Sequence, residues 1–318
     1  MNKYNMNIFI TGGTGFLGKV TIKNLIKNGY NVFALVRSEN SKNIALQLGA
    51  VPVFGDINNL NSNELSLKDI DTVIHCAAPV EFKGPWINFE KQILQATLNL
   101  AKIAIEQNVK NFIHISSESV LQGNDDLVNI NEEYEYPQKC NSFYGEAKKL
   151  AEKSLLSLNS SMRVIILRPT FIYGEGCPSL IKILEKAKSN QFPWINNGES
   201  FFEAVHVENV AQAISLAITN GKNNSIYTIT DNVQWTVRTF FENIFKKNNI
   251  KISQFSIPKY LLYPIAFLID FIWNKFNLKI APPLSLFELA FISQSRRYNI
   301  SKAVSELMYS PKKFIENK

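Results

Sequence analysis

Tyr144 and Lys148 are the residues whose types and spacing most directly suggest chemistry. They stand four apart in "FYGEAKK", in a stretch whose pattern predicts a helix through Leu158. Both side chains would therefore emerge on one face of that helix. A phenol is a poor acid or base at neutral pH, but a nearby ammonium group stabilises the phenolate and lowers its pKa. Tyr144 could then exchange a proton with a substrate oxygen.

Ser117 could complete this set. It follows the apolar run "NFIHIS" and would stand at the carboxyl end of a strand, where open α/β sheets bind ligands. Its hydroxyl would hold the substrate oxygen and stabilise charge that develops there. Two other interpretations stay open: Ser116 and Ser117 end a strand without further function, and the Tyr–Lys pair is one of many that surface helices supply.

The elements that must position these residues follow from the apolar pattern. Near-continuous apolar runs are typical of buried parallel strands. Helical periodicity lies between them, as in Phe16–Lys27, which Gly29 closes, and in Ile87–Gln107. This alternation predicts an α/β fold, a doubly wound parallel sheet of the Rossmann type. The strand-like runs are "NIFIT", "NVFALV", "VPVF", "TVIHCA", "NFIHIS" and "RVIILRP".

The regular alternation of strand-like and helical patterns ends after residue 173. One helix is expected at Leu180–Lys188, and the runs "AVHV" and "SIYTIT" are expected to return to the main sheet. We therefore assign 1–173 plus 204–230 to a Rossmann domain that binds a dinucleotide. The segments 174–203 plus 231–318 would form a smaller, discontinuous, mainly helical C-terminal lobe that binds the substrate.

The segment "TGGTGFLG" is a candidate phosphate-binding loop. It follows the first strand and opens a helix, and its glycines fit the G-x-G-x-x-G pattern. Backbone N–H groups at the helix start would face a pyrophosphate, and the glycines would let it approach. A tight turn without a ligand is the alternative. The expected cofactor contacts in this loop are Gly12, Thr14, Gly15, Phe16, Leu17 and Gly18.

The ends of the second and third strands indicate which cofactor is bound. Arg37, in "ALVRSEN", suits a 2′-phosphate, so NADP(H) is favoured over NAD(H). Alternatively, Arg37 is solvated and Glu39 holds the ribose of NAD. Asp56 would accept from the adenine amino group and Ile57 would pack on the ring, although an Asp at this position also forms turns. Lys148 would hydrogen-bond the nicotinamide ribose.

Composition excludes several classes of function. The chain has 318 residues, 46% of them apolar, and a formal charge of +7 without a block of like charges, so a nucleic-acid partner is not expected. The three cysteines and three histidines have no metal-site spacing, the histidines are expected to be satisfied core residues, and no GxSxG motif supports a serine hydrolase. The amino terminus has no signal-peptide pattern, which favours a cytoplasmic location.

Taken together, the motifs resemble the extended short-chain dehydrogenase/reductase superfamily. They occur in its order and spacing from residue 7 to about 218: "TGGTGFLG", "GDI", "HCAA", "SSESV", "YGEAK", "LRPTFIYGEG" and "AVHVENVAQA". The resemblance implies a catalytic triad and three further cofactor contacts. The triad is Ser117, Tyr144 and Lys148. Ala77 and Ala78 would line the cofactor, and Pro169 and Ile172 would lie near the nicotinamide carboxamide.

Departures from the superfamily pattern select a branch. Ile93 stands where an "NVxGT" pattern has Asn, and whether Asn99 takes over its role is open. The Arg-Asp-Phe of nucleotide-sugar epimerases and dehydratases is replaced by Phe201-Phe202-Glu203, which removes a partner for a sugar diphosphate. The closing segment from Ser285 is similar to that of 3β-hydroxysteroid dehydrogenase-like proteins, with Met308 in place of a Gly.

These features predict an NADP(H)-dependent oxidoreductase that interconverts a secondary alcohol and a ketone on a hydrophobic substrate, sterol-like or a lipid-derived β-keto compound. A nucleotide-sugar epimerase or dehydratase is the alternative. A non-catalytic NADP-binding sensor is a further alternative, disfavoured because such proteins often lose the Tyr or Lys. A homodimer is left open.

The run "KYLLYPIAFLIDFIWNKF", Lys259 to Phe276, is the most apolar in the chain. Its core from Tyr260 to Trp273 would be about 21 Å long as a helix, short of the ~30 Å hydrocarbon core of a bilayer. Pro264 and Asp270 interrupt it. We expect the wall or lid of an apolar substrate cleft, with peripheral membrane contact through 259–279 as a secondary role.

Overall fold

The computed structural model describes residues 6–62, 65–79, 84–251, 254–276 and 284–315. Its centre is a seven-stranded sheet, parallel throughout, with the strand order β12-β7-β5-β4-β1-β2-β3. The inner strands β4 and β5 are buried along their whole length. This confirms the predicted doubly wound sheet. Its strands are β1 (Asn7–Thr11), β2 (Asn31–Val36), β3 (Val51–Phe54), β4 (Thr72–His75), β5 (Asn111–Ile115), β7 (Arg163–Pro169) and β12 (Ser225–Ile229).

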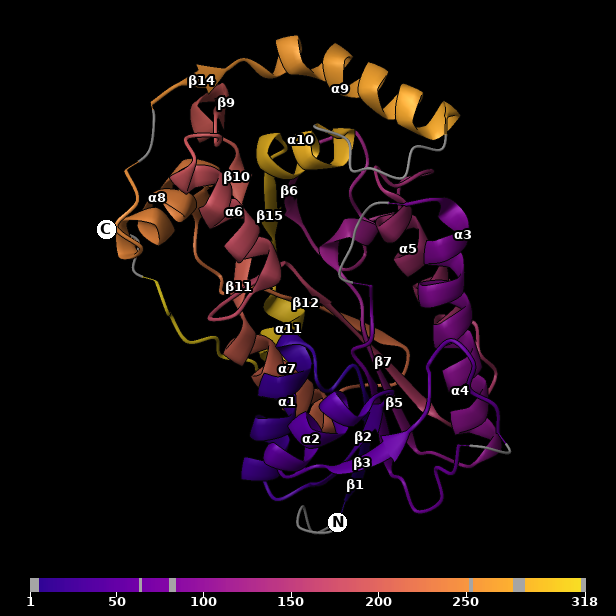
Figure 1. Ribbon diagram of the computed structural model, residues 1–318. Coiled ribbons are helices and arrows are strands. Elements are labelled where there is room, and N and C mark those ends of the chain that lie inside the picture. Colours follow the sequence, from indigo (N-terminus) through magenta and orange to yellow (C-terminus); the bar gives the residue numbers. More distant parts are fainter. Residues whose placement is uncertain (1–5, 63–64, 80–83, 252–253, 277–283, 316–318) are drawn as a thin grey trace.

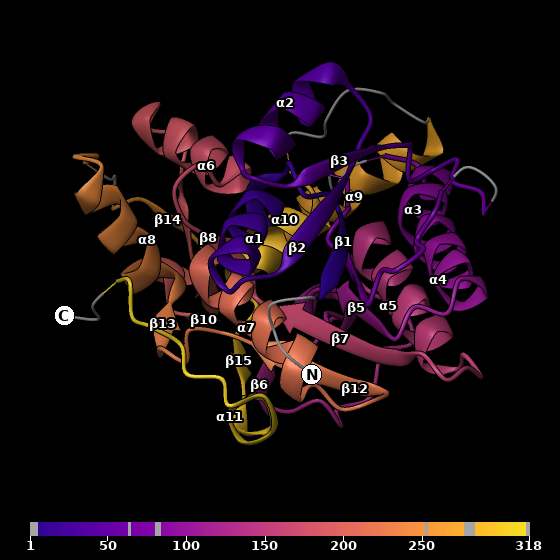
Figure 2. The same ribbon diagram turned by 90° about the horizontal axis from the view of Figure 1, so that it is seen from below.

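Helices cover both faces of the sheet (Figures 1 and 2). Alternate residues of each strand point to opposite faces, so Ile8 and Ile10 join one core cluster and Phe9 joins the other. The first face carries α1 (Phe16–Lys27), α2 (Glu39–Gln47), α7 (Val207–Asn220) and α11 (Ser301–Leu307); the second carries α4 (Ala96–Glu106) and α5 (Phe143–Leu156).

The helix predicted at Ile87–Gln107 is helical but irregular. It consists of α3 (Trp86–Phe89), a π-helical stretch at Glu90–Gln95 and then α4. Such π-helical turns occur frequently at functional sites. Here the wider turn contains Ile93, the residue that replaces the Asn of the superfamily pattern.

The prediction that "AVHV" returns to the main sheet is wrong. This segment forms β11 (Ala204–His206), which pairs in parallel with β8 (Phe171–Tyr173) in a separate two-stranded sheet. The chain continues past the end of β7 through Thr170 into β8, so β11 finds its partner beyond the carboxyl edge of the main sheet. Three further small sheets pair β6 (Leu127–Ile130) with β15 (Arg296–Tyr298), β9 (Trp194–Ile195) with β14 (Ser256–Ile257), and β10 (Phe201–Phe202) with β13 (Trp235–Thr236).

An aromatic core lies above this edge of the sheet, between α6 (Pro178–Lys188) and α8 (Val237–Lys247). The Phe171 ring lies 5.3 Å from Phe291 of α10 (Leu286–Ser293) and 5.7 Å from Phe202, measured between ring centroids. Helix α9 (Lys259–Lys275) packs on α10 and crosses the top of the molecule in Figure 1. Among the described residues, no helix is long and apolar enough to cross a membrane.

A buried ion pair joins α5 to β7. Arg168 Nη2 lies 2.6 Å from Glu152 Oε2, and Arg168 Nε donates to Glu152 Oε1 at 3.0 Å. Tyr136 donates its hydroxyl proton to Glu152 and accepts from Arg168, both at 2.8 Å. Glu152 and Arg168 are almost completely excluded from solvent. The bidentate geometry and the phenol satisfy both carboxylate oxygens of Glu152, whereas Arg168 Nη1 has no hydrogen-bond partner among the described residues.

We predict that Glu152→Ala lowers the free energy of unfolding by about 3–5 kcal/mol, because it leaves the Arg168 guanidinium buried without its carboxylate. Chemical denaturation measures this loss. Glu106→Ala is the matched control, since Glu106 forms only an exposed i,i+4 pair with Lys102 and should cost less than about 1 kcal/mol. Equal losses in the two variants would contradict this interpretation.

Candidate active site

Most of the predicted site residues meet at one edge of the sheet. The strands are parallel, so their carboxyl ends lie together. The glycine loop follows β1, Arg37 follows β2, Asp56 follows β3, Ala77 and Ala78 follow β4, Ser117 follows β5, and Pro169 ends β7. Ile172 lies just beyond, in β8.

The glycine loop has the geometry of a phosphate cradle. Gly12 has a φ of +70°, and a Cβ atom there would come within 2.7 Å of Ala77 N. A Cβ atom on Gly18 would overlap the Gly12 carbonyl oxygen. Helix α1 begins at Phe16 after Gly15, which has no side chain to cap the first N–H groups. The N–H groups at the start of α1, which no N-cap side chain covers, and the tight glycine packing fit a dinucleotide pyrophosphate.

The residues after β2 differ in their environment. Ser38 caps α2 and accepts a hydrogen bond from Ser41 N, and Glu39 pairs with Lys42 at 3.0 Å. Arg37 is exposed and forms no ion pair within the described ranges. Glu39, the residue that would hold a ribose in the NAD interpretation, is thus an exposed carboxylate beside a lysine on the surface of α2.

Asp56 closes a turn after β3. Its Oδ1 accepts from the backbone N and the side-chain Nδ2 of Asn58, at 3.0 and 3.1 Å. The turn-forming role considered for this residue is therefore present in the structure. Ile57 packs against the core cluster beneath the sheet. Contact of either residue with adenine stays a prediction.

Ser117 and Tyr144 are brought together by two helix starts. Ser117 is the N-cap of a 3₁₀ turn at Glu118–Val120, and Tyr144 lies in the first turn of α5, capped by Ser142. A Cβ atom on Gly145 would lie 2.5 Å from Ser119 O, so the glycine beside Tyr144 permits this close approach. The Ser117 side chain lies close enough to the Tyr144 phenol to lower its pKa.

Burial controls the protonation of the site. It raises the pKa of Tyr144 to about 12, and the hydrogen bond with Ser117 opposes this increase. Burial lowers the pKa of Lys148 to about 8. The Lys148 ammonium donates to Ile115 O at 2.7 Å, which fixes it below the end of β5. At neutral pH Tyr144 therefore carries its proton and can donate it to an acceptor oxygen.

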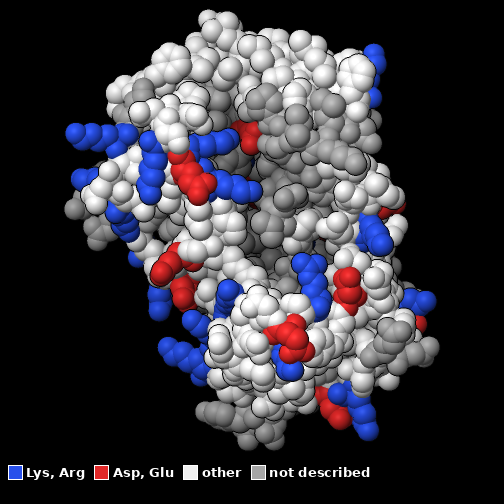
Figure 3. Space-filling model, viewed as in Figure 1, with Lys and Arg blue, Asp and Glu red and all other residues white. Residues whose placement is uncertain are grey.

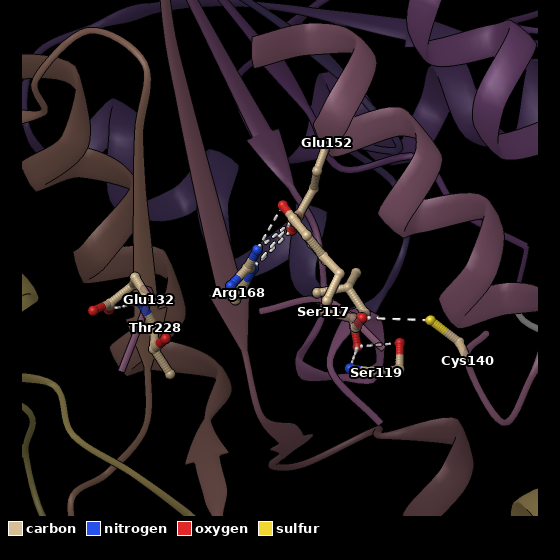
Figure 4. Close-up of polar contacts among 9 residues, drawn as sticks. Ser117, Ser119, Glu132, Cys140, Glu152, Arg168 and Thr228 are labelled. Atoms are coloured by element: carbon tan, nitrogen blue, oxygen red, sulfur yellow. Dashed lines mark hydrogen bonds and ion pairs between the residues drawn. The ribbon is translucent and has the colours of Figure 1, made fainter. Parts of the chain in front are cut away.

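The sequence-based prediction missed Ser119. Its hydroxyl donates to Ser117 Oγ at 3.0 Å, and its backbone N donates to the same oxygen at 3.2 Å. Figure 4 shows the two serines side by side on one turn, with Glu152 and Arg168 of the buried ion pair nearby. The signal was present in "SSES", since a polar residue two positions after an N-cap is well placed to contact it.

The contacts of Asn99 show whether it takes over the role of the Asn that Ile93 replaces. Asn99 Nδ2 donates to Leu60 O at 2.6 Å, so this side chain is tied to another loop. Ile93 is buried and packs in a cluster with Tyr144. An apolar side chain therefore occupies the position where the superfamily pattern has the amide side chain of Asn.

Thr97, on the same helix, contacts His75 Nε2 at 3.0 Å, while Thr11 contacts the other ring nitrogen of His75 at 2.7 Å.

The histidine prediction is only partly confirmed. His75 is buried and both of its ring nitrogens have partners, as expected. His114 is also buried, but neither ring nitrogen has a hydrogen-bond partner in the described part of the chain. Burial and the nearby Lys148 ammonium lower its pKa, so the ring is neutral. His206 stacks on Phe314, with ring centroids 3.6 Å apart.

Fold and site together define a member of the extended short-chain dehydrogenase/reductase superfamily. Residues 9–250 match the 3-beta hydroxysteroid dehydrogenase/isomerase family, and the chain belongs to this family of NAD(P)-dependent oxidoreductases.

Several characterised proteins are similar to the chain. Sterol-4-alpha-carboxylate 3-dehydrogenase, decarboxylating, of Dictyostelium discoideum is 33% identical over 96% of both chains. A 4-hydroxy-2-methyl-3-oxo-4-farnesyl-3,4-dihydroquinoline-1-oxide ketoreductase of Stigmatella aurantiaca is 25% identical over 96% of this chain and 92% of its own. A UDP-glucose 4-epimerase of Vibrio cholerae is 34% identical over 72% of each.

The fold is also found in solved structures. The UDP-glucose 4-epimerase of Thermotoga maritima has a TM-score of 0.74, with 22% identity, over 96% of this chain and 94% of its own. This likeness concerns the fold alone.

We predict that Gly18→Ala weakens NADPH binding by more than about tenfold, or ~1.4 kcal/mol, because the new methyl group displaces the loop at Gly12. Titration by NADPH fluorescence measures the loss. Gly176→Ala is the control: a Cβ there meets no atom within 4 Å, so its positive φ should cost stability but not cofactor affinity. Unchanged NADPH affinity in Gly18→Ala would show that this loop does not hold the cofactor.

Proposed function

We propose that the chain is an NADP(H)-dependent oxidoreductase that interconverts a secondary alcohol and a ketone on a hydrophobic substrate, sterol-like or a lipid-derived β-keto compound. The observation that carries this proposal is the buried Tyr144, which the packing of Gly145 on Ser119 O brings close to Ser117. Both residues lie at the same edge of the sheet as the glycine cradle. A proton donor and a dinucleotide site at one edge are what carbonyl reduction requires.

The bound cofactor supplies or accepts the hydride. In the reductive direction Tyr144 donates its proton to the carbonyl oxygen. The oxidative direction requires Tyr144 to lose its proton first, which the raised pKa of this phenol disfavours at neutral pH. Ser117 holds the same oxygen by a hydrogen bond, while Ser119 fixes the Ser117 hydroxyl from behind. Lys148 supplies positive charge beneath the site, where its ammonium donates to Ile115 O. The lowering of the Tyr144 pKa that we expected from this ammonium is not found: burial raises that pKa, and Ser117 opposes the increase.

The apolar nature of the substrate is supported by the surroundings of the site. Trp86, Phe89 and Phe143 cluster with Tyr144 on one side. Phe171 and Phe291 lie on the side of the aromatic core. The Dictyostelium relative is named for a sterol and the Stigmatella relative for a farnesylated ketone. Both names pair a hydrophobic skeleton with chemistry at a carbonyl or hydroxyl carbon.

A nucleotide-sugar epimerase is the second candidate, favoured by the similarity to the Vibrio cholerae enzyme. The residues before β11 argue against it. Glu203 stands at the third position of the Arg-Asp-Phe motif, where the epimerase pattern has Phe. It is buried, and burial together with the nearby Glu118 raises its pKa to about 8. It offers no positive charge to a diphosphate, and neither do Phe201 and Phe202.

The preference for NADP(H) rests on Arg37. It is exposed at the end of β2, and Glu39 is paired with Lys42. A guanidinium can form two hydrogen bonds to a 2′-phosphate, whereas NADH offers only a hydroxyl there.

We therefore expect Arg37→Ser to raise the dissociation constant for NADPH by about 10–100-fold and to change that for NADH little. Titrations with both cofactors test this. Glu39→Gln serves as the control and should leave both affinities close to wild type. If instead Glu39→Gln weakens NADH and Arg37→Ser leaves NADPH unaffected, the chain uses NAD.

The catalytic assignment is tested by Tyr144→Phe. We expect kcat to fall by about 10²–10⁴-fold with NADPH binding retained, because only the transferable proton is lost. NADPH oxidation with steroid ketones, β-keto acids and aromatic ketones gives the rate, and fluorescence gives the affinity. Tyr134→Phe, on the exposed surface, is the matched control and should keep full activity. Retained turnover in Tyr144→Phe would remove the residue from the mechanism.

A further inference from the structure

Helix α9 exposes an unusual amount of apolar surface. Its large side chains at the surface have exposed fractions from 47% to 74%, and Phe276 beyond its end is also exposed. The exposed positions between residues 260 and 271 carry no charge. They are Tyr260, Leu261, Tyr263, Pro264, Ile265, Phe267, Leu268 and Phe271. Contiguous apolar surface of this kind marks an interaction site.

The inward face of the helix is already occupied. Ala266 is fully buried and, with Leu262, packs against Leu289 of α10. Asp270, the acidic residue within α9, accepts a hydrogen bond from Leu286 N at 2.8 Å. The acidic group is thereby directed toward α10, and the outward face keeps only uncharged side chains.

The exposed arc is too wide for a flat partner. At 100° per residue, the exposed positions span roughly 200° of the helix circumference. A second copy of the chain would cover one side of this ridge and leave its flanks in water. Lipid headgroups and acyl chains can surround the flanks as well as the crest.

The charges around the helix favour an anionic surface. Lys259 begins α9 and Lys275 ends it, with Lys275 Nζ 5.7 Å from the Phe271 ring centroid. Lysines at the edge of an apolar helix face can reach headgroup phosphates while their stems stay on apolar surface. The formal charge of the whole chain is +7, which adds long-range attraction to anionic lipids. In Figure 3 the upper surface, where Figure 1 places α9, is mainly white.

We propose that α9 docks on the surface of an anionic phospholipid bilayer, lying in the plane of the interface. Its 17 residues give a length of about 25 Å, which suits a helix lying along the interface. Tyr260 and Tyr263 would sit at the headgroup level, where a phenol keeps its hydroxyl in water.

Docking at this place has a consequence for the substrate, and this part rests on the proposed function. Helix α10 lies between α9 and the aromatic core, and its Phe291 contacts Phe171 above the sheet edge. An apolar substrate dissolved in the bilayer would therefore be close to the substrate side of the site. The docked enzyme would draw its substrate from the membrane instead of from water.

Flotation with lipid vesicles tests the docking without reference to activity. The full chain is mixed with vesicles of phosphatidylcholine, or of phosphatidylcholine with phosphatidylglycerol. We expect binding to the mixed vesicles, weaker binding to the neutral ones, and a loss of about tenfold or more in Ile265→Ser/Leu268→Ser. Lys259→Gln/Lys275→Gln should reduce the preference for anionic vesicles.

The control variant is Leu46→Ser/Val51→Ser. These residues have exposed fractions of 52% and 51%, against 51% and 57% for Ile265 and Leu268, and lie on α2 and β3 at the opposite end of the molecule (Figure 1). The control should bind vesicles like wild type. Unchanged vesicle binding in the α9 variant, or equal losses in both variants, would overturn the proposal.

Two further readouts keep the result interpretable. Thermal unfolding and NADPH titration verify that the α9 variant is folded. Sedimentation velocity tests the second-copy alternative: a wild-type dimer that the α9 substitutions dissociate, with no binding to either kind of vesicle, would overturn docking on a membrane. An enzyme that floats with vesicles but oxidises no NADPH on any ketone would contradict the proposed function while leaving the docking intact.

Discussion

The arrangement of the site depends on the buried ion pair between Glu152 and Arg168. Arg168 is the next-to-last residue of β7, and Glu152 lies two turns after Tyr144 on α5. Because both charges are excluded from solvent, any displacement of α5 along the sheet would break bonds that water cannot replace. The pair therefore fixes the height of α5 relative to the carboxyl edge. Tyr144 and Lys148 gain defined positions as a result.

The second constraint is close approach of backbone to backbone. Gly12 lies against Ala77, and Gly145 lies against the carbonyl of Ser119. A methyl group at Gly12 would push the glycine loop away from the end of β4. A methyl group at Gly145 would push α5 away from the turn that Ser117 caps. The buried ion pair within the core and the glycine contacts at the edge together fix the position of Tyr144 relative to the glycine loop.

Much of the fold could be predicted because the relevant signals are local. Buried parallel strands are apolar runs, helices have a 3.6-residue period, and the glycine loop occupies consecutive positions. The pairing of β11 with β8 could not be predicted, since three residues carry too little pattern to choose a partner. Met308, a departure noted in the sequence, adopts a left-handed φ of +61°, where the family's Gly would be unstrained.

The site was predictable in its residue types but not in its supporting contacts. Glu152 and Arg168 are ordinary charges in the sequence, and only the packing of α5 on β7 makes them a buried pair. Ser119 was overlooked because its contact depends on the turn that Ser117 caps. For the apolar run at Lys259, the sequence indicated a wall or lid of the cleft. In the structure, α10 supplies Phe291 to the aromatic core and α9 lies outside it, because the tertiary position of an apolar helix is not encoded in its own composition.

The central claim is that Tyr144 delivers a proton to a carbonyl oxygen while hydride reaches the carbonyl carbon of a hydrophobic ketone. The most direct measurement is product analysis by mass spectrometry after reaction with deuterated NADPH and a β-keto or steroid ketone. The account predicts one deuterium on the new carbinol carbon. Conversion of UDP-glucose to its 4-epimer without net NADPH consumption, and no deuterated alcohol from any of the ketones, would contradict it.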